Sequence, residues 1–332
     1  MVMKMIVVLE DKAAPEFKES LAESSASYRK VSLYGKTVYV TWGDSVVPPD
    51  HSVSVKGEGF PILSSRAWKP DDTVIDVSGV PIGSRDIVIA AGPCAVESED
   101  QFADIAEKVV RWGASILRGG AFKPRTSPYS FQGLGVDGIR IMHSVAEKLD
   151  VPIVTEIMDG DTLRHCSNMI DFIQIGSRNA QNFSLLHEVG VSGKPVLLKN
   201  GMGNTVNEWL NSSEYILSEG NENVVLCYRG IKTFENSVRF AFDAGSLVRT
   251  KLISHLPVAA DPSHPAGDSN LVESIALAAV AAGADMLEIE VHPDPRNAKS
   301  DSSQQLTPEQ FRQTVERIEK LSAALGRGIW RK

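Results

Sequence analysis

The chain has little cysteine and no long apolar run. Its three cysteines lie far apart, at Cys94, Cys166 and Cys227, and this spacing excludes a disulfide framework and a local zinc knuckle. We expect Cys166 and Cys227 to be structural. No apolar run approaches the roughly 18 residues of a membrane span, and the N-terminal stretch turns acidic too early for a signal peptide. The sequence therefore predicts a cytoplasmic protein.

The chain also lacks an excess of positive charge. It has 34 Lys and Arg against 42 Asp and Glu, a formal net charge of −8, which argues against a general nucleic-acid binder. Hydrophobic residues make up 42% and charged residues 23% of the chain, as expected for a soluble enzyme of one large domain or of a large and a small one. Any cluster of cations is therefore local, and we expect it to meet a small anion.

One stretch, residues 117–127, concentrates positive charge. Arg118, Lys123 and Arg125 fall within eight positions, with two glycines and a proline fixing the backbone between them. Cations this close repel one another unless an anion lies among them. Arginine can clamp a phosphate or carboxylate with two hydrogen bonds, whereas lysine acts as a point charge. The stretch indicates an anion site or, alternatively, a solvated basic loop.

The first 65 residues predict a small α+β module. Strands are expected at residues 3–9, 31–34 and 37–42, the last two joined by a turn at Gly35-Lys36, and a helix is expected at 15–27. Residues 45–59 are rich in Pro, Gly and Ser and have no helical period. Residues 66–85 read as a linker and a second hairpin, which leaves residues 86–332 for the main domain.

The main domain alternates apolar runs with helical patterns. The runs are residues 87–91, 115–117, 152–155, 172–175, 195–198, 224–227, 257–260 and 286–289. Eight strands and helices over about 240 residues predict a (β/α)8 TIM barrel. The helical patterns near 161–169 and 234–242 are the weakest. A doubly wound sheet is the alternative, but no Gly-x-Gly-x-x-Gly follows the first strand.

Polar residues follow nearly every predicted strand, where barrel enzymes carry their chemistry. One set is cationic and calls for a multiply charged substrate, most simply a phosphorylated one: Arg118, Lys123, Arg125, Arg178, Lys199 and Arg229. A second set could hold a divalent transition metal: Cys94, His264, Glu290 and Asp301. Their spacing is no metal signal, and only barrel closure would bring them together. Alternatively, Cys94 is a buried hydrophobe, His264 caps a backbone group, and Asp301 is a turn residue.

Seven motifs run through the predicted barrel in order. They are Ala-Gly-Pro-Cys at 91–94, the stretch from Leu-Arg-Gly-Gly to Gly-Leu-Gly at 117–135, Gln-Ile-Gly-Ser-Arg-Asn-Ala-Gln-Asn at 174–182, Lys-Pro-Val-Leu-Leu-Lys at 194–199, Arg-Gly-Ile-Lys-Thr-Phe-Glu at 229–235, Asp-Pro-Ser-His at 261–264 and Glu-Val-His-Pro at 290–293. On these motifs the chain resembles 3-deoxy-D-arabino-heptulosonate 7-phosphate (DAHP) synthase, in the microbial branch related to 3-deoxy-manno-octulosonate 8-phosphate synthase. The N-terminal module is loosely similar to the ferredoxin-like regulatory domain of some members.

The resemblance implies a metal-dependent condensation of phosphoenolpyruvate with erythrose 4-phosphate, the first step of the shikimate pathway to the aromatic amino acids. By this resemblance, Arg178 and Arg229 hold the phosphate of phosphoenolpyruvate. Arg118, Lys123 and Lys199 surround its carboxylate and bridging region, and Gln174 also contacts substrate. The aldose phosphate meets the segment Lys123, Pro124, Arg125, Thr126 and Ser127.

The resemblance also implies the remaining roles. Mn, Fe, Co or Zn is held by Cys94, His264, Glu290 and Asp301. The candidates for proton transfer are Lys123, Glu156 and His264. Further expectations are a homotetramer and an aromatic amino acid effector acting through the N-terminal module.

Several alternatives remain. The octulosonate enzyme usually has Lys-Ala-Asn-Arg-Ser where this chain has Lys-Pro-Arg-Thr-Ser, so erythrose 4-phosphate is favoured, and Cys94 indicates the metal-dependent set. Asn200, Tyr228 and the segment 268–270 depart from the branch's charge pattern, which leaves open a specialised enzyme with another aldose. An aldolase with a Schiff base on Lys199 and a non-catalytic sensor of a phosphorylated ligand are two further possibilities.

Overall fold

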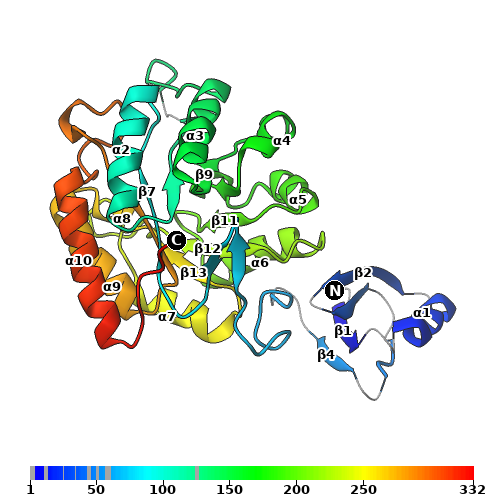
Figure 1. Ribbon diagram of the computed structural model, residues 1–332. Helices are drawn as coiled ribbons and strands as arrows, with labels where there is room; N and C mark the ends of the chain where they lie inside the picture. The colour runs from blue at the N-terminus through cyan, green and yellow to red at the C-terminus, as the bar shows by residue number, and fades with distance from the viewer. Residues whose placement is uncertain are drawn as a thin grey trace.

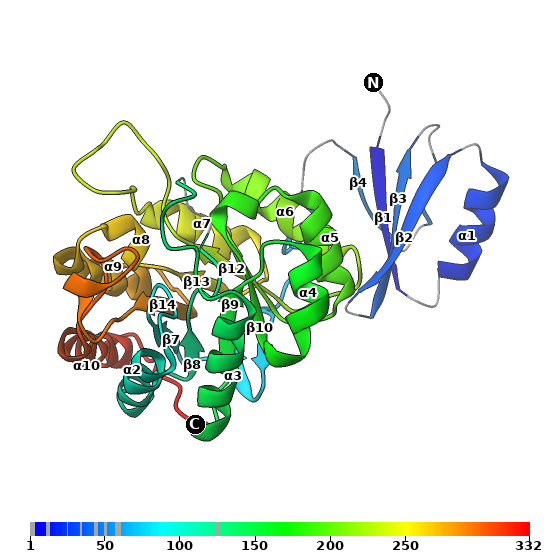
Figure 2. The same ribbon diagram turned by 90° about the horizontal axis from the view of Figure 1, so that it is seen from above.

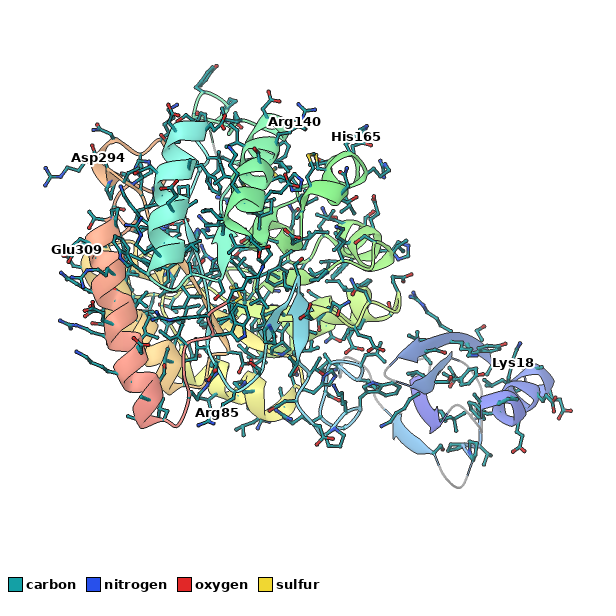
Figure 3. The ribbon with its side chains drawn as sticks, in the orientation of Figure 1. Lys18, Arg85, Arg140, His165, Asp294 and Glu309 are labelled. Atoms are coloured by element: carbon teal, nitrogen blue, oxygen red, sulfur yellow. The ribbon has the colours of Figure 1, made fainter. Side chains whose placement is uncertain are left out.

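The computed structural model describes residues 4–10, 14–24, 26–33, 35–42, 46–49, 52–56, 61–123 and 127–332. A small N-terminal unit stands beside a larger barrel, and the C-terminus lies against the barrel (Figure 1). Labelled charged side chains such as Arg140, Asp294 and Glu309 project outward from the barrel (Figure 3). Within the described residues, no helix is both long and apolar enough to span a membrane.

The N-terminal unit is an antiparallel sheet with one described helix. Its elements are β1 (Lys4–Glu10), α1 (Ala14–Glu23), β2 (Ser27–Leu33), β3 (Lys36–Trp42) and β4 (Val53–Lys56), and the strand order is β2-β3-β1-β4. Phe17 and Leu21 of α1 pack on Tyr39 and Leu9 of the sheet, forming a separate small core. The turn at Gly35 has φ +71°, which glycine adopts without strain. The predicted hairpin is confirmed, but β4 was not predicted.

The other face of this sheet meets the barrel. Val31 and Val38 join the large core through Ile62 and Leu63. The Glu214 carboxylate of the barrel accepts hydrogen bonds from the backbone amides of Leu63 and Ser64, at 3.0 and 2.8 Å. Residues 61–73 are therefore more than a loose linker, because they pack in the core and are hydrogen-bonded to the barrel.

Eight parallel strands close the barrel in the order β10-β11-β12-β13-β14-β7-β8-β9. They are β7 (Val88–Gly92), β8 (Ile116–Arg118), β9 (Ile153–Glu156), β10 (Phe172–Ile175), β11 (Val196–Lys199), β12 (Val224–Tyr228), β13 (Val258–Ala260) and β14 (Met286–Glu290). Almost all of their residues are buried. Each strand overlaps one of the eight predicted apolar runs, so all eight runs are confirmed as strands. Continuous apolar runs are typical of parallel strands that are covered on both faces.

Helices surround the strands, as Figure 2 shows from above. The helices are α2 (Glu99–Arg111), α3 (Val136–Leu149), α4 (Gly160–Cys166), α5 (Phe183–Val191), α6 (Val206–Leu217), α7 (Ala244–Ile253), α8 (Ser263–Ala266), α9 (Ser269–Ala281) and α10 (Pro308–Ala324), with short 3-10 turns η1 (Ser167–Met169), η2 (Ser177–Asn179) and η3 (Pro295–Asn297). Thr205 and Thr307 form full capping boxes with Glu208 and Gln310, which fixes where α6 and α10 begin.

A hairpin closes the amino end of the barrel. It consists of β5 (Ile75–Val77) and β6 (Val80–Ile82), as predicted. Its aliphatic side chains Ile75, Val77, Val80 and Ile82 pack in one cluster with inward-facing strand residues such as Phe172. With this end filled by side chains, the carboxyl ends of the strands are the end left for chemistry.

The prediction of a helix near residues 234–242 is wrong. This segment is a loop whose ends are joined by a β-bridge between Ile231 and Ala241. The helix begins only at Ala244. The Asp243 side chain accepts a hydrogen bond from the Ser246 amide at 3.0 Å and so caps the first turn of this helix. The weak pattern near 161–169 does form helix, as α4 followed by η1.

Candidate active site

A cavity of about 330 Å³ opens at the carboxyl ends of the strands. Most of the predicted site residues line it together: Arg118, Lys123, Ser127, Glu156, Gln174, Arg178, Lys199, Arg229, His264 and Asp301. Several end a strand or follow one directly, since Arg118 ends β8, Glu156 ends β9 and Lys199 ends β11. The barrel therefore collects at one opening side chains that lie more than 180 residues apart in the chain.

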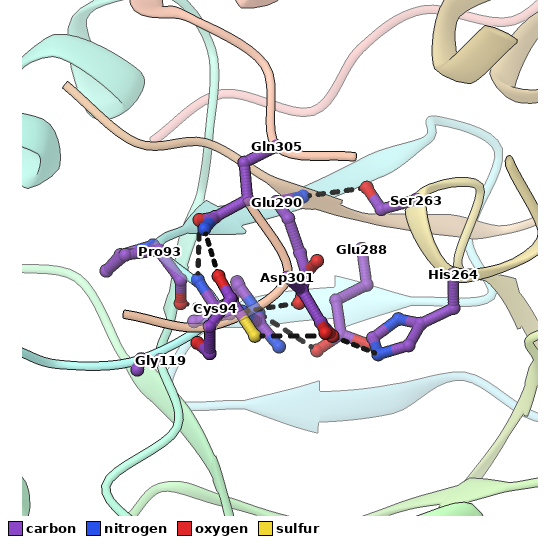
Figure 4. A network of polar contacts seen from close by, with 12 residues as sticks. Pro93, Cys94, Gly119, Ser263, His264, Glu288, Glu290, Asp301 and Gln305 are labelled. Atoms are coloured by element: carbon purple, nitrogen blue, oxygen red, sulfur yellow. Dashed lines mark hydrogen bonds and ion pairs between the residues drawn. The ribbon is translucent and has the colours of Figure 1, made fainter. Parts of the chain in front are cut away.

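Three of the four predicted metal ligands form a tight group. Cys94, Glu290 and Asp301, here called the donor group, each offer one ligand atom, and these atoms lie within 4.8 Å of one another. His264 lies beside the group, with Nε2 3.8 Å from Oδ2 of Asp301, and Figure 4 shows the four side chains converging. A thiol, two carboxylates and an imidazole are a donor set that suits a divalent transition metal. These residues therefore fit such an ion.

The donor group is held by neighbours that the sequence did not reveal. The Gln304 side-chain amide donates to Glu290, and Arg239 pairs with Asp301 at 3.3 Å. Asp301 itself has φ +43°, a left-handed conformation that is rare for residues other than glycine and that tends to occur at functional sites. Burial, together with the Glu290 charge, raises the pKa of the Cys94 thiol to about 12 despite Lys123, whose Nζ lies 3.0 Å from the sulfur.

Two of the predicted cations are already neutralised by the protein. Glu288, which was not predicted, lies 3.3 Å from Arg118 and 2.8 Å from Lys199 inside the barrel. Asp261 lies 2.7 Å from Lys199, and Glu290 lies 3.3 Å from Arg118. Arg118 and Lys199 therefore already have carboxylate partners inside the protein, in addition to any anion that the cavity binds. Glu288 stands two residues before Glu290 on β14, so strand alternation could have placed it on the same face.

This network sets the charge of Lys199. Burial alone would lower its pKa, but Asp261 and Glu288 outweigh burial and raise the pKa above its usual value. An ammonium group has no lone pair for attack on a carbonyl. The network therefore argues against the alternative in which Lys199 forms a Schiff base.

Two arginines of the cavity remain without a carboxylate. Within the described part of the chain, neither Arg178 nor Arg229 forms an ion pair. Arg229 is 5% exposed, its guanidinium lies 3.9 Å from the centroid of the Phe240 ring, and its Nη1 has no hydrogen-bond partner. Burial lowers its pKa although Asp261 opposes this. A buried and unpaired guanidinium favours binding of an anion.

Two acids lie at the active site: Glu156 lines the cavity, and the buried Asp261 contacts His264, which also lines it. Burial raises the pKa of Glu156, although Lys123, Lys199 and Arg178 pull it down. A Cβ atom on Gly176 would lie 2.0 Å from Oε1 of Glu156, so any larger residue there would force this carboxylate to move from its observed place. Asp261 Oδ2 lies 2.6 Å from Nδ1 of His264, and its Oδ1 accepts a hydrogen bond from the His264 backbone amide at 3.0 Å, so Asp261 holds this residue in place.

The predicted aldose-phosphate segment is seen only in part. Pro124, Arg125 and Thr126 lie outside the described residues. On either side, Lys123 donates to the carbonyl oxygen of Cys94 at 2.9 Å, and Ser127 lines the cavity. A Cβ on Gly120 would lie 2.6 Å from that same carbonyl oxygen and 2.9 Å from Nζ of Lys123. Glycine at this position therefore leaves room for the lysine to turn inward.

The fold and these contacts define a (β/α)8 barrel whose cavity gathers several arginines and lysines beside a metal-capable donor group. A model of the DAHP synthetase I family matches residues 71–326. The chain belongs to this family, which confirms the family and the enzyme class predicted from the motifs.

Relatives with two enzyme names match the chain, and the heptonate aldolase below is more similar to it than the octonate aldolase. The phospho-2-dehydro-3-deoxyheptonate aldolase of Thermotoga maritima is 46% identical over 264 residues, covering 80% of this chain and 78% of the relative. A crystal structure of this aldolase, also called DAHP synthase, matches with a TM-score of 0.80 and 38% identity, and the match covers 98% of this chain and 99% of the crystallised chain. A 2-dehydro-3-deoxyphosphooctonate aldolase of Desulfatibacillum aliphaticivorans is 31% identical over 243 residues, covering 67% of this chain and 87% of the relative.

Proposed function

We propose that the chain condenses phosphoenolpyruvate with erythrose 4-phosphate and water, giving DAHP and inorganic phosphate. C3 of phosphoenolpyruvate forms the new bond to the aldehyde carbon, water adds at C2, and the C2–O bond to phosphate breaks. The observation that carries the proposal is a cavity lined by two arginines that have no carboxylate partner among the described residues, and by Asp301 of the donor group. A site for two phosphorylated substrates and a metal ion needs both features.

Phosphoenolpyruvate is bound by the cations of the cavity. Arg178 and Arg229 hold its phosphate, because both lack a carboxylate partner among the described residues. Arg118, Lys123 and Lys199 surround its carboxylate and bridging oxygen, with Gln174 alongside. Arg118 and Lys199 are fixed by Glu288, so they need not reorganise when substrate arrives.

The aldose phosphate binds at the segment Lys123, Pro124, Arg125, Thr126 and Ser127. Of this segment, Lys123 lies beside Cys94 of the donor group. Cys94, His264, Glu290 and Asp301 hold a divalent ion such as Mn²⁺, Fe²⁺, Co²⁺ or Zn²⁺. When bound, such an ion polarises an oxygen ligand as a Lewis acid. Glu156, Lys123 and His264 are the groups that transfer protons, and burial makes the Glu156 carboxylate a stronger base than usual.

The N-terminal unit is proposed to be a ferredoxin-like regulatory domain. Residues 1–65 form it, residues 66–85 link it, and residues 86–332 are the catalytic barrel. Its strand order β2-β3-β1-β4, with α1 after the first strand, supports this assignment. We further propose that the enzyme is a homotetramer and that an aromatic amino acid acts through this domain.

Release of inorganic phosphate tests the reaction. We expect release to require both phosphoenolpyruvate and erythrose 4-phosphate, to stop in excess chelator and to return when Mn²⁺ is added. Release without the aldose phosphate would contradict the condensation, and full activity in chelator would contradict the metal requirement.

Arg178→Ala tests the assigned binding site. It should weaken phosphoenolpyruvate binding by about ten- to hundredfold, since hydrogen bonds to charged groups contribute about 1.5–3 kcal/mol. Arg140→Ala is the matched control, because Arg140 is an exposed arginine on the outer helix α3. Equal behaviour of the two variants in calorimetric titration would remove Arg178 from the site.

A further inference from the structure

The Asn200 side chain contacts the backbone at Arg229, the arginine that has no carboxylate partner among the described residues. It follows β11 and is 2% exposed. Its Oδ1 accepts a hydrogen bond from the Arg229 backbone amide at 2.8 Å, and its Nδ2 donates to the carbonyl oxygens of Gly201 and Gly230, both at 3.2 Å. One side chain therefore ties down the backbone on both sides of Arg229.

The backbone needs this support because the barrel ladder ends here. The last paired residues of β11 and β12 are Lys199 and Cys227, so the Arg229 amide has no strand partner and would otherwise be a buried, unpaired donor. The chain then turns sharply at Gly230, where φ is +84° and a Cβ would lie 3.0 Å from the carbonyl oxygen of Ala241. The asparagine amide takes the place of the missing ladder at this turn.

The Arg229 side chain has few other restraints. Its guanidinium lies over the Phe240 ring, and among the described residues no carboxylate pairs with it. Stacking on the ring keeps the guanidinium group over the ring face, but it allows the group to slide parallel to that face. The position of the guanidinium in the cavity therefore depends on where its own backbone is held.

We propose that Asn200 is a positioning residue that places the Arg229 guanidinium for the phosphate of phosphoenolpyruvate. The inference rests on the proposed function, in which Arg229 binds that phosphate. Asn200 does not line the main cavity, so it acts through Arg229 and not by touching substrate. Its loss lets the backbone at Arg229 and Gly230 shift, which misaligns one of the two phosphate-binding arginines and leaves binding of the aldose phosphate unchanged.

A matched control is available in Asn221. This residue is also buried, at 3%, and its side chain also bridges the backbone, donating to the Lys194 carbonyl oxygen at 2.8 Å and accepting from the Asn223 amide at 3.0 Å. It precedes β12, at the opposite end of the strand from Arg229. Asn221→Ala therefore removes a comparable set of hydrogen bonds without affecting the backbone at Arg229.

The test measures KM for each substrate separately and the Kd of phosphoenolpyruvate by calorimetry. Asn200→Ala should raise KM and Kd for phosphoenolpyruvate about tenfold, the effect of one net hydrogen bond, and leave KM for erythrose 4-phosphate within about twofold. Asn221→Ala should leave both KM values unchanged. Asn200→Ser, which keeps a hydroxyl and space for water, is the gentler variant to measure if the alanine variant does not fold.

A double-mutant cycle separates positioning from general loosening. In the Arg229→Ala background, Asn200→Ala should weaken phosphoenolpyruvate binding no further, because the residue through which it acts is gone. Additive effects, equal increases in both KM values, or an effect no larger than that of Asn221→Ala would each overturn the proposal. A wild-type protein that binds phosphoenolpyruvate without turnover would refute the proposed reaction but would still allow the Asn200 test by calorimetry.

Discussion

Replacing Glu288 with glutamine should destabilise the barrel strongly. The carboxylate is 1% exposed and lies between two buried cations, 3.3 Å from Arg118 and 2.8 Å from Lys199. Glutamine keeps the size but removes the charge. Breaking a buried ion pair typically costs about 3–5 kcal/mol of unfolding free energy. Arg118 keeps Glu290 and Lys199 keeps Asp261, so the cost should fall at the lower end, about 3 kcal/mol.

Urea unfolding followed by tryptophan fluorescence and circular dichroism measures this cost. A loss of this size should lower Tm by about 10 °C in a domain as large as the barrel. Asp104→Asn is the control, since its pair with Lys108 is 2.7 Å long but roughly half exposed, and it should cost no more than about 0.5 kcal/mol. If Glu288→Gln unfolds within about 0.5 kcal/mol of the wild type, Glu288 does not provide the compensating charge proposed for Arg118 and Lys199.

Three further predictions concern the donor group and two titrating residues. Cys94→Ser should keep the fold and phosphoenolpyruvate binding but lose most of its metal and turnover, because a hydroxyl is a poorer ligand for a soft transition metal than a thiolate. Metal analysis, calorimetry and a turnover assay check this prediction. A variant that keeps both metal and full turnover would make Cys94 a packing residue. Burial lowers the pKa of His255 to about 4, so below its ordinary value of 6.5 the unfolded chain takes up the proton first. Stability should therefore fall from pH 6.5 to about pH 4 by up to ~3 kcal/mol, and His255→Gln should show a smaller fall; equal slopes in urea unfolding at several pH values would refute this. Burial raises the pKa of Glu156 above 4.5, so turnover should decline as pH falls through that raised pKa, and Glu156→Gln should abolish this acid limb while phosphoenolpyruvate still binds; an unchanged pH profile would exclude Glu156 as a proton carrier.

Most of the barrel was predictable because its signals are local. Each strand is a short apolar run buried on both faces, and helix starts such as Thr205 and Thr307 carry their caps within four residues. The sequence failed to predict the secondary structure of segments whose conformation depends on tertiary contacts. β4 exists through its pairing with β1, and residues 234–242 stay irregular because a bridge and the Asp243 cap define the loop.

The sequence predicted where the candidate site lies in the barrel, but it did not predict which side chains neutralise or hold the cations of the site. Strand ends identify Arg118, Glu156, Lys199 and Glu290, because every parallel strand delivers its last residues to the same opening. The sequence could not show that Glu288 lies between Arg118 and Lys199, or that Asn200 anchors Arg229. These contacts join residues 29 to 170 positions apart, and they depend on the closed register of the barrel.

A panel of aldose phosphates offered with phosphoenolpyruvate, followed by phosphate release and mass measurement of the product, tests the proposed reaction most directly. The account predicts the highest kcat/KM with erythrose 4-phosphate and a seven-carbon 3-deoxy sugar phosphate as product. Preference for a five-carbon aldose phosphate, with an eight-carbon product, or no phosphate release with any aldose would contradict it.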